Sequence, residues 1–308
     1  MPSGAPLGPA PAALPTDWPH RSFSHSLQAG GLLWHLQVMR PPLADEAPVV
    51  LLLHGTGASS HSFFKLASVL AQSHTLLMPD LPGHGWTQRP AGDGLSLPGM
   101  ARSLGALLAT LGARPVLLIG HSAGAAIAAR LCLDGHCAPH GLLSLNGAWF
   151  PPRGVSQGWF APAAKLLVRN PLLPHFFAWQ ASRPAVLKRL LDSTGSKLDA
   201  AAAAPYARLV SSPAHVSAVL AMMAAWDLRP LLHDLPQLRP RLHLVVGQSD
   251  GTIAPHQAHQ VQQMVPGSRV HSLPGLGHLA HEEAPAAVAQ LVMQLLTGLA
   301  APGRAVPD

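Results

Sequence analysis

The sequence reads Gly120-His121-Ser122-Ala123-Gly124 immediately after the apolar run Pro115-Val116-Leu117-Leu118-Ile119. The apolar run predicts a buried strand, and the small residues of 123–133 predict a helix after the turn. A serine between a strand and a helix has a strained backbone that lifts its hydroxyl above the edge of the sheet. The two glycines leave room where neighbouring chain passes too close for side chains. Because a G-x-S-x-G pattern also arises by chance in a chain rich in Gly and Ala, the inference depends on the strand and helix around it.

Strands and helices alternate on both sides of this turn. Apolar runs predict strands at 32–39, 49–53, 75–78, 116–119, 141–145, 242–246 and 269–272. Helical patterns lie at 63–71, 98–111, 123–133, 255–264 and 285–299. This alternation predicts an α/β fold with a mostly parallel central sheet flanked by helices.

Residues 149–226 interrupt the alternation, because they contain no convincing strand. Their aromatic residues are Trp149, Phe150, Trp159, Phe160, Phe176, Phe177, Trp179 and Trp226. Their charged residues are the basic Arg153, Lys165, Arg169, Arg183, Lys188, Arg189, Lys197 and Arg208 and the acidic Asp192 and Asp199. We expect most of the aromatic side chains to pack a helical segment onto the core. The basic excess indicates an anionic, largely apolar ligand or an anionic membrane surface.

The domain organisation follows from these patterns. We expect 17–148 and 236–300 to form the core, with a helical lid at 149–235 inserted after the sixth strand. The Pro- and Ala-rich residues 1–16 are expected to be a flexible arm, and 301–308 a loose tail. The candidate side chains of a substrate pocket under the lid are Trp149, Phe150, Met222, Met223 and Trp226.

The composition excludes several classes of protein. Hydrophobic residues make up 48% of the chain, yet no run of about 18 uncharged apolar residues suits a membrane span. The N-terminus lacks the basic segment and continuous apolar stretch of a signal peptide. The net charge of +6 comes from scattered arginines, without the basic run that binds nucleic acid. We therefore expect a cytoplasmic protein with no nucleic-acid partner.

Two cysteines, Cys132 and Cys137, lie beside His136 and His140 and raise the question of a metal site. The spacing C-x3-H-C-x2-H is not usual for zinc, and Cys132 falls on a helix face expected to be buried. Two cysteines give no disulfide framework, in agreement with a reducing compartment. We expect no metal ion and no cofactor.

A nucleophilic serine needs a base, and the base needs a carboxylate that orients it. His278 is the expected base, because it follows the last strand on the Gly-rich loop 273–278, which can return an imidazole over the sheet edge. His281 is its main rival, and we interpret it as facing the lid or as a partner of Glu282 or Glu283. His54 and His121 are assigned to structural turns.

Asp250 is the expected carboxylate. It follows the strand at 242–246 and so lies at the carboxyl edge of the sheet, although a Ser-Asp-Gly sequence is also a common turn. The other position at this edge, after the strand ending at Leu145, carries Asn146 and no acid. Asp80 lies in a tight loop and is interpreted as a structural hydrogen-bond acceptor.

An oxyanion hole needs two backbone N–H groups directed at the developing negative charge. One is expected from Ala123, which follows the serine at the N-terminus of a helix, where the helix dipole also helps. The other is expected from Thr56, in the loop after His54-Gly55.

In five ordered motifs the chain resembles the α/β-hydrolase superfamily. The motifs are His54-Gly55-Thr56-Gly57, Asp80-Leu81-Pro82-Gly83-His84-Gly85, Gly120-His121-Ser122-Ala123-Gly124, Gly247-Gln248-Ser249-Asp250 and Gly277-His278. Each motif is weak alone, but the set spans nearly the whole chain after residue 16. The resemblance implies the fold of that superfamily and a Ser-Asp-His triad. A serine at this position argues against the epoxide hydrolases and haloalkane dehalogenases of the same fold, which use an aspartate nucleophile.

Further segments are similar to one family within it, the magnesium-chelatase accessory proteins (BchO) of photosynthetic bacteria. These segments are 50–59, 120–126, 143–148, 220–226 and 275–283. The family is associated with bacteriochlorophyll synthesis, so the resemblance implies a pathway and leaves the substrate open. A basic, aromatic lid is compatible with a tetrapyrrole, a flat apolar ring that carries carboxylates or esters.

Two functions therefore stay open. The first is a serine hydrolase that acts on a carboxylic ester or thioester, with Ser122, His278 and Asp250 as its triad. The second is a non-catalytic accessory or pigment-binding protein that assists magnesium chelatase, because a fold does not determine a function. The expected partners are a small-molecule ester or tetrapyrrole intermediate, magnesium chelatase, and a membrane surface contacted through the lid.

Overall fold

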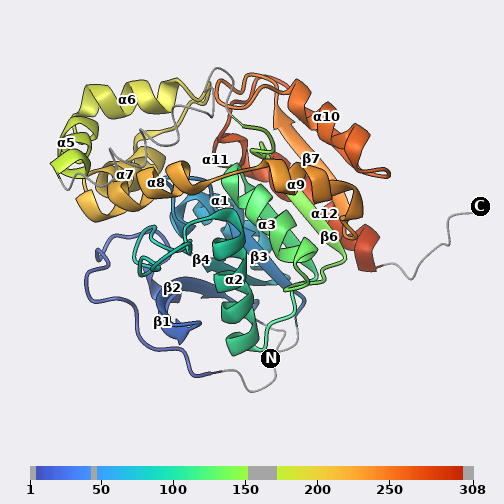
Figure 1. Ribbon diagram of the computed structural model, residues 1–308, viewed down its shortest axis with the longest axis horizontal. Helices are drawn as coiled ribbons and strands as arrows, with labels where there is room; N and C mark the ends of the chain where they lie inside the picture. Colours follow the sequence, from blue (N-terminus) through green and yellow to red (C-terminus); the bar gives the residue numbers. More distant parts are fainter. Residues whose placement is uncertain (1–4, 43–46, 152–171, 301–308) are drawn as a thin grey trace, which may run out of the picture.

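The computed structural model describes residues 5–42, 47–151 and 172–300 of the chain (Figure 1). Its centre is an eight-stranded sheet with the order β1-β2-β4-β3-β5-β6-β7-β8. The strands are β1 (Ser24–Ala29), β2 (Leu32–Met39), β3 (Val49–Leu53), β4 (Thr75–Pro79), β5 (Leu117–His121), β6 (Gly141–Leu145), β7 (Arg241–Gly247) and β8 (Arg269–Leu273). Strand β2 is antiparallel to both of its neighbours, and all other pairs are parallel. The predicted strands and the mostly parallel sheet are confirmed.

Strand β1 was not predicted from the sequence. Its residues, Ser-His-Ser-Leu-Gln-Ala, form no apolar run, and the strand forms because it pairs in register with β2 along its whole length. It lies at one edge of the sheet, where a strand can face solvent on one side.

Helices cover both faces of the sheet, and successive apolar side chains along a strand point to opposite faces. In β3, Leu51 and Leu53 belong to the core under one helical layer, whereas Val50 and Leu52 belong to the core under the other. The first layer contains α2 (Leu97–Leu111), α3 (Ala123–Leu133) and α10 (His256–Met264), and the second contains α1 (Phe64–Leu70) and α12 (Pro285–Ala300). Burial on two faces explains why these parallel strands read as continuous apolar runs.

A helical insertion separates β6 from β7, which confirms a helical segment after the sixth strand. Its helices are α5 (Leu172–Ala181), α6 (Pro184–Asp192), α7 (Ala200–Val210), α8 (Pro213–Ala225) and α9 (Arg229–Asp234). The side chains of Asp199 and Ser212 cap α7 and α8, and Pro213 stands at the first position of α8. Helices α5 to α8 lie at the upper left of Figure 1. The domain limits at 149 and 235 stay a prediction.

Short helical turns complete the fold. They are η1 (Arg21–Phe23), η2 (Ser60–Phe63), η3 (Leu235–Gln237) and α11 (Ala280–Glu283). Within the described ranges, none of the helices has the length and apolar character needed to cross a membrane.

The interpretation of residues 1–16 as a flexible arm is wrong for residues 5–16. Gly8 forms a β-bridge with Ser26, and the N–H group of Ala5 donates to the carbonyl of Thr110 at 3.2 Å. Leu14 is buried in a small apolar cluster with Trp18 and Leu209. This proline-rich segment forms no helix or strand of its own. The buried side chain of Leu14 holds it in place by packing against Trp18 and Leu209. The predicted tail at 301–308 lies outside the described residues.

Replacing Leu14 by alanine tests this anchor. We expect Leu14→Ala to lower the free energy of unfolding by about 2–3 kcal/mol, because it removes buried methyl groups and leaves a cavity. Leu33→Ala is the matched control, since the Leu33 side chain is 43% exposed on β2 and should cost less than about 1 kcal/mol. Urea unfolding measures both values, and equal costs for the two variants would contradict the anchor.

Candidate active site

Ser122 occupies the strained turn that the sequence predicts. Its φ of 51° and ψ of −117° lie outside the regions that side chains favour, and its N–H group donates to the carbonyl of Leu145 at 2.9 Å. A Cβ on Gly124 would overlap the carbonyl of Leu53, so only glycine fits where α3 begins beneath the turn. The tight packing between β3, β5 and α3 thus holds the serine at the carboxyl edge of the sheet.

His278 and Asp250 meet at the same edge. The Nδ1 atom of His278 lies 2.8 Å from Oδ2 of Asp250, and the Asp250 side chain is 1% exposed. An ionised carboxylate only accepts hydrogen bonds, so Nδ1 carries the proton and Nε2 is left as the proton acceptor. This is the arrangement that a general base requires.

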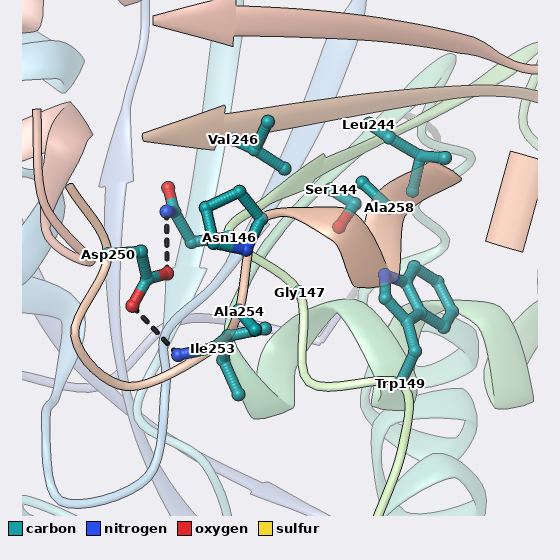
Figure 2. Close-up of a pocket in the computed structure, with 11 residues that line it drawn as sticks. Ser144, Asn146, Gly147, Trp149, Leu244, Val246, Asp250, Ile253, Ala254 and Ala258 are labelled. Carbon is teal, nitrogen blue, oxygen red and sulfur yellow. Dashed lines mark hydrogen bonds between the residues drawn. The ribbon is translucent and has the colours of Figure 1, made fainter. Parts of the chain in front are cut away.

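Three further donors hold the Asp250 carboxylate, and Figure 2 shows two of them, Asn146 and Ile253. The N–H groups of Thr252 and Ile253 donate to Oδ1 at 2.7 and 2.8 Å, and Nδ2 of Asn146 donates to Oδ2 at 2.8 Å. In the sequence, Asn146 drew attention only because no acid stands at that position. Its role as a hydrogen-bond donor to Asp250 was not predicted. The sequence feature that could have indicated this role is an amide side chain directly after β6. This strand lies beside β7, and Asp250 follows β7.

His121, the residue before Ser122, packs against His278. The His121 ring lies 4.8 Å from the His278 ring, and its Nε2–H group donates to the carbonyl of His278 at 3.0 Å. Among the described residues, no hydrogen bond joins the Ser122 hydroxyl to His278. The structure therefore pairs the acid with the base and places the serine at the same edge.

The two predicted oxyanion donors, Thr56 and Ala123, both present free N–H groups. Neither group donates to another residue in the described part of the chain. A Cβ on Gly55 would come within 3.0 Å of Ser122 Cβ, which places the Thr56 loop beside the serine. The first N–H groups of a helix are well suited to bind negative charge.

Neutral histidines support the loop that carries Thr56. Nδ1 of His54 donates to the carbonyl of Gly55 at 2.8 Å, while its Nε2 accepts from Leu81 at 2.8 Å. His215 on α8 was not foreseen; its Nε2 donates to the carbonyl of Gly57 at 3.2 Å and its Nδ1 accepts from Gly85 at 3.1 Å. The structural interpretation of His54 agrees with these contacts.

Asp80 is the structural acceptor that the sequence predicts. Its carboxylate accepts from the N–H groups of Ser60 and Trp86 and lies 2.7 Å from Nδ1 of His35. Burial alone would raise the pKa of Asp80, but His35 and these donors hold that pKa well below its ordinary value. The ionised group therefore fixes the loop after β4.

The interpretation of His281 as facing the lid is wrong, whereas the alternative of a partner of Glu282 agrees with the contact between the two side chains. Its ring is fully buried between Phe63 and His121, and burial lowers its pKa to about 3. Nε2 of His281 lies 3.9 Å from Oε1 of Glu282, whose carboxylate accepts a short hydrogen bond from Tyr206. His281 is thus a core residue, consistent with His278 as the better candidate base.

The comparison with known proteins can be set beside this geometry. The sequence model of the alpha/beta hydrolase family matches residues 50–291. The chain belongs to the α/β-hydrolase family. A magnesium-chelatase 30 kDa subunit of Rhodobacter capsulatus is 36% identical over 289 residues, which cover 94% of this chain and 99% of that protein. This relative confirms the resemblance to the magnesium-chelatase accessory family.

Solved structures show the same α/β-hydrolase fold. An α/β-hydrolase fold protein from Burkholderia ambifaria has a TM-score of 0.71 at 22% identity and covers 87% of this chain and 96% of its own. An esterase from Exiguobacterium antarcticum has a TM-score of 0.70 at 18% identity, with coverage of 88% and 98%. At these identities the likeness concerns the fold alone.

The predicted pocket residues of this hydrolase differ in burial, although Trp149 and Met222 belong to one apolar cluster against which Phe150 and Trp226 pack. Trp149 lines a cavity of about 10 Å³ beside Asn146 and Asp250 (Figure 2), which has room for about one water molecule. Met222 is buried in the core, Phe150 and Trp226 pack at its rim, and the Met223 side chain is 62% exposed. This cavity is too small for an ester substrate, so a pocket built from these side chains stays a prediction.

The basic residues Arg153, Lys165 and Arg169 and the aromatic residues Trp159 and Phe160 lie outside the described residues. Within the insertion, Arg208 is 2.6 Å from Asp17 of the N-terminal segment. Some of the basic excess therefore balances acids elsewhere in the chain.

The cysteine and histidine cluster shows no sign of a metal centre in the residues the structure describes. Cys132 and Cys137 are free thiols, and burial raises the pKa of Cys137 to about 11. The ring of His136 packs against Gly105 on α2.

The buried histidines predict an acid-sensitive fold. Burial lowers the pKa of His54 from 6.5 to about 4, so between these values the unfolded chain binds more protons than the folded one. The free energy of unfolding should therefore fall as the pH drops from about 6.5 to about 4, by up to about 1.4 kcal/mol per pH unit for each such histidine. Urea unfolding across this range measures the slope.

His54→Gln should make that slope shallower, because glutamine does not titrate. The matched control is His259→Gln, which changes an exposed histidine on α10 and should leave the slope unaltered. A slope that is the same for wild type and His54→Gln would rule out His54 as a source of the acid sensitivity.

Proposed function

We propose that this α/β-hydrolase is a serine hydrolase that cleaves a carboxylic ester or thioester. Ser122 Oγ attacks the carbonyl carbon while its proton passes to Nε2 of His278, and Asp250 orients the imidazole and stabilises its charge. The N–H groups of Thr56 and Ala123 bind the oxyanion. The alcohol or thiol leaves with that proton, and water then attacks the acyl-enzyme by the same route to release the acid.

The observation that carries this proposal is the hydrogen bond between His278 and Asp250. It selects the tautomer whose free nitrogen can accept a proton, at the edge of the sheet where Ser122 stands in its strained turn. Hydrogen bonds to a catalytic serine are often long without substrate and shorten in the complex, so the missing Ser122–His278 bond is compatible with this role.

The biological setting that we propose is bacteriochlorophyll biosynthesis in the cytoplasm. The support is the 36% identity to the Rhodobacter capsulatus magnesium-chelatase subunit along nearly the whole of both chains. On this proposal the substrate is an ester or thioester, with a tetrapyrrole intermediate as one candidate, and magnesium chelatase is the partner protein.

A second function is favoured by the same relative, because it is described as a subunit of the chelatase and not as a hydrolase. In this alternative the chain is a non-catalytic accessory or pigment-binding protein that assists magnesium chelatase. The fold and the Asp250–His278 pair would then be retained for binding.

A fluorophosphonate probe separates the two functions. We expect wild type to be labelled and to hydrolyse p-nitrophenyl butyrate, and we expect Ser122→Ala to lose labelling and at least about 1,000-fold of kcat. Ser103→Ala, on α2 and away from the site, is the control and should be labelled like wild type. Metabolite profiling of a Ser122→Ala strain should then reveal the accumulating ester.

The opposite result would favour the accessory function. A folded wild-type protein that is not labelled, together with a Ser122→Ala gene that restores pigment synthesis in a deletion strain, would sink the hydrolase proposal.

We also propose that α5 and α6 contact an anionic membrane surface. Large exposed apolar side chains are concentrated there: Leu172, Phe176, Phe177, Trp179 and Leu190. The guanidinium of Arg183 stacks 4.0 Å from the Trp179 ring centre, and α5 carries no acidic residue. Exposed aromatics next to cationic groups are typical of surfaces that lie in a membrane interface.

Vesicle sedimentation tests this contact. We expect the protein to sediment with vesicles of phosphatidylcholine and phosphatidylglycerol, less at high salt, and we expect Phe176→Ser combined with Trp179→Ser to reduce the bound fraction. Phe23→Ser combined with Leu33→Ser is the control, because these side chains are also exposed but lie away from the insertion. Equal binding by both double variants would contradict the proposed membrane contact of α5 and α6.

A further inference from the structure

The loop that joins α6 to α7 touches both loops of the proposed acid–base pair. We call residues 193–197 the brace loop. The carbonyl of Thr194 accepts from the N–H group of Gly251 at 3.1 Å and from the N–H group of His278 at 3.0 Å. One carbonyl of the helical insertion thus binds the backbone of His278 itself and of the residue after Asp250.

A second hydrogen bond from the brace loop holds the base. The buried hydroxyl of Ser196 accepts from the N–H group of Leu279 at 2.8 Å. Two consecutive N–H groups of the base loop, those of His278 and Leu279, are therefore bound by the insertion. Neither belongs to a strand of the sheet.

Close backbone contact makes this junction rigid. Gly195 has a φ of +75°, and a Cβ on it would overlap the carbonyl of Ser249, the residue before Asp250. A Cβ on Gly277, the residue before His278, would overlap the backbone of Gly195. The brace loop therefore packs with its backbone directly against the backbones of both the acid loop and the base loop.

The brace loop is itself anchored to α6. The N–H group of Ser193 donates to the carbonyl of Arg189 at 2.9 Å, and that of Gly195 donates to Asp192 at 3.0 Å. These bonds continue the last turn of the helix. A displacement of α6 is consequently transmitted to the residues on either side of Asp250 and His278.

We propose that the brace loop is a positioning element of the catalytic site, which sets the distance between Asp250 and His278 through Thr194, Gly195 and Ser196. This proposal rests on the proposed hydrolase function for its catalytic meaning. The helical insertion would thus determine the geometry of proton transfer. A misplacement on the order of 1 Å costs about 100-fold in rate in other enzymes.

Two pairs of variants test the brace loop. Ser196→Ala removes the acceptor for Leu279, and Ser196→Thr keeps a hydroxyl in that position. Gly195→Ala forces a Cβ against Ser249, whereas Gly135→Ala places a Cβ at a φ of +74° where nothing lies within 4 Å. Gly135→Ala therefore carries the same backbone strain without the contact.

Turnover and hydrogen exchange are measured on all four variants. We expect Ser196→Ala and Gly195→Ala to lower kcat for p-nitrophenyl butyrate by about 10- to 100-fold with little change in KM. Amide exchange of peptides covering 249–253 and 276–280 should become faster in the same two variants. Ser196→Thr and Gly135→Ala should resemble wild type in both measurements. If Gly195→Ala does not fold, the comparison of Ser196→Ala with Ser196→Thr tests the proposal by itself.

The outcomes separate this inference from the proposed function. Unchanged exchange in Ser196→Ala and Gly195→Ala, or faster exchange with unchanged kcat in an active protein, would overturn the brace loop. A wild type that has no esterase activity, with faster exchange in the two variants, would defeat the hydrolase proposal while the loop still positions Asp250 and His278.

Discussion

The contact between Asp250 and His278 requires two loops from neighbouring strands to meet within 2.8 Å, and much of the site serves that contact. Strands β7 and β8 are parallel, so both loops leave the same edge of the sheet. Asn146, which follows β6, donates to Oδ2 of Asp250, and two backbone N–H groups donate to the other carboxylate oxygen, Oδ1. The buried carboxylate is thus stabilised by four hydrogen-bond donors, those of His278, Asn146, Thr252 and Ile253.

The buried histidines that support the loops of the candidate site are neutral for a physical reason. Burial lowers the pKa values of His54, His121 and His215, and each donates one N–H group to a backbone carbonyl. Neutral rings hold these loops in place through hydrogen bonds without placing a positive charge in the interior. The same burial predicts that the stability of the fold depends on pH, so the positioning of these loops and the expected acid sensitivity have one origin.

The sequence predicts those features that depend on local patterns. Apolar runs gave the parallel strands, and the spacing of Ser122, Asp250 and His278 after three of them placed these residues at one edge. Features that depend on contacts between distant segments were missed or misread. Strand β1 forms through pairing alone, His281 is buried by Phe63 from another element, and residues 5–16 are held by Leu14. The residue pattern within one segment does not indicate which distant segment it will contact.

The helical insertion reaches both sides of the candidate site by separate contacts. His215 on α8 binds the carbonyl of Gly57, next to the proposed oxyanion donor, while Thr194 binds the N–H group of His278. The acid–base pair and the oxyanion loop therefore share one support that lies outside the sheet. We therefore expect a change in this insertion to alter the geometry of the candidate site while the sheet stays the same.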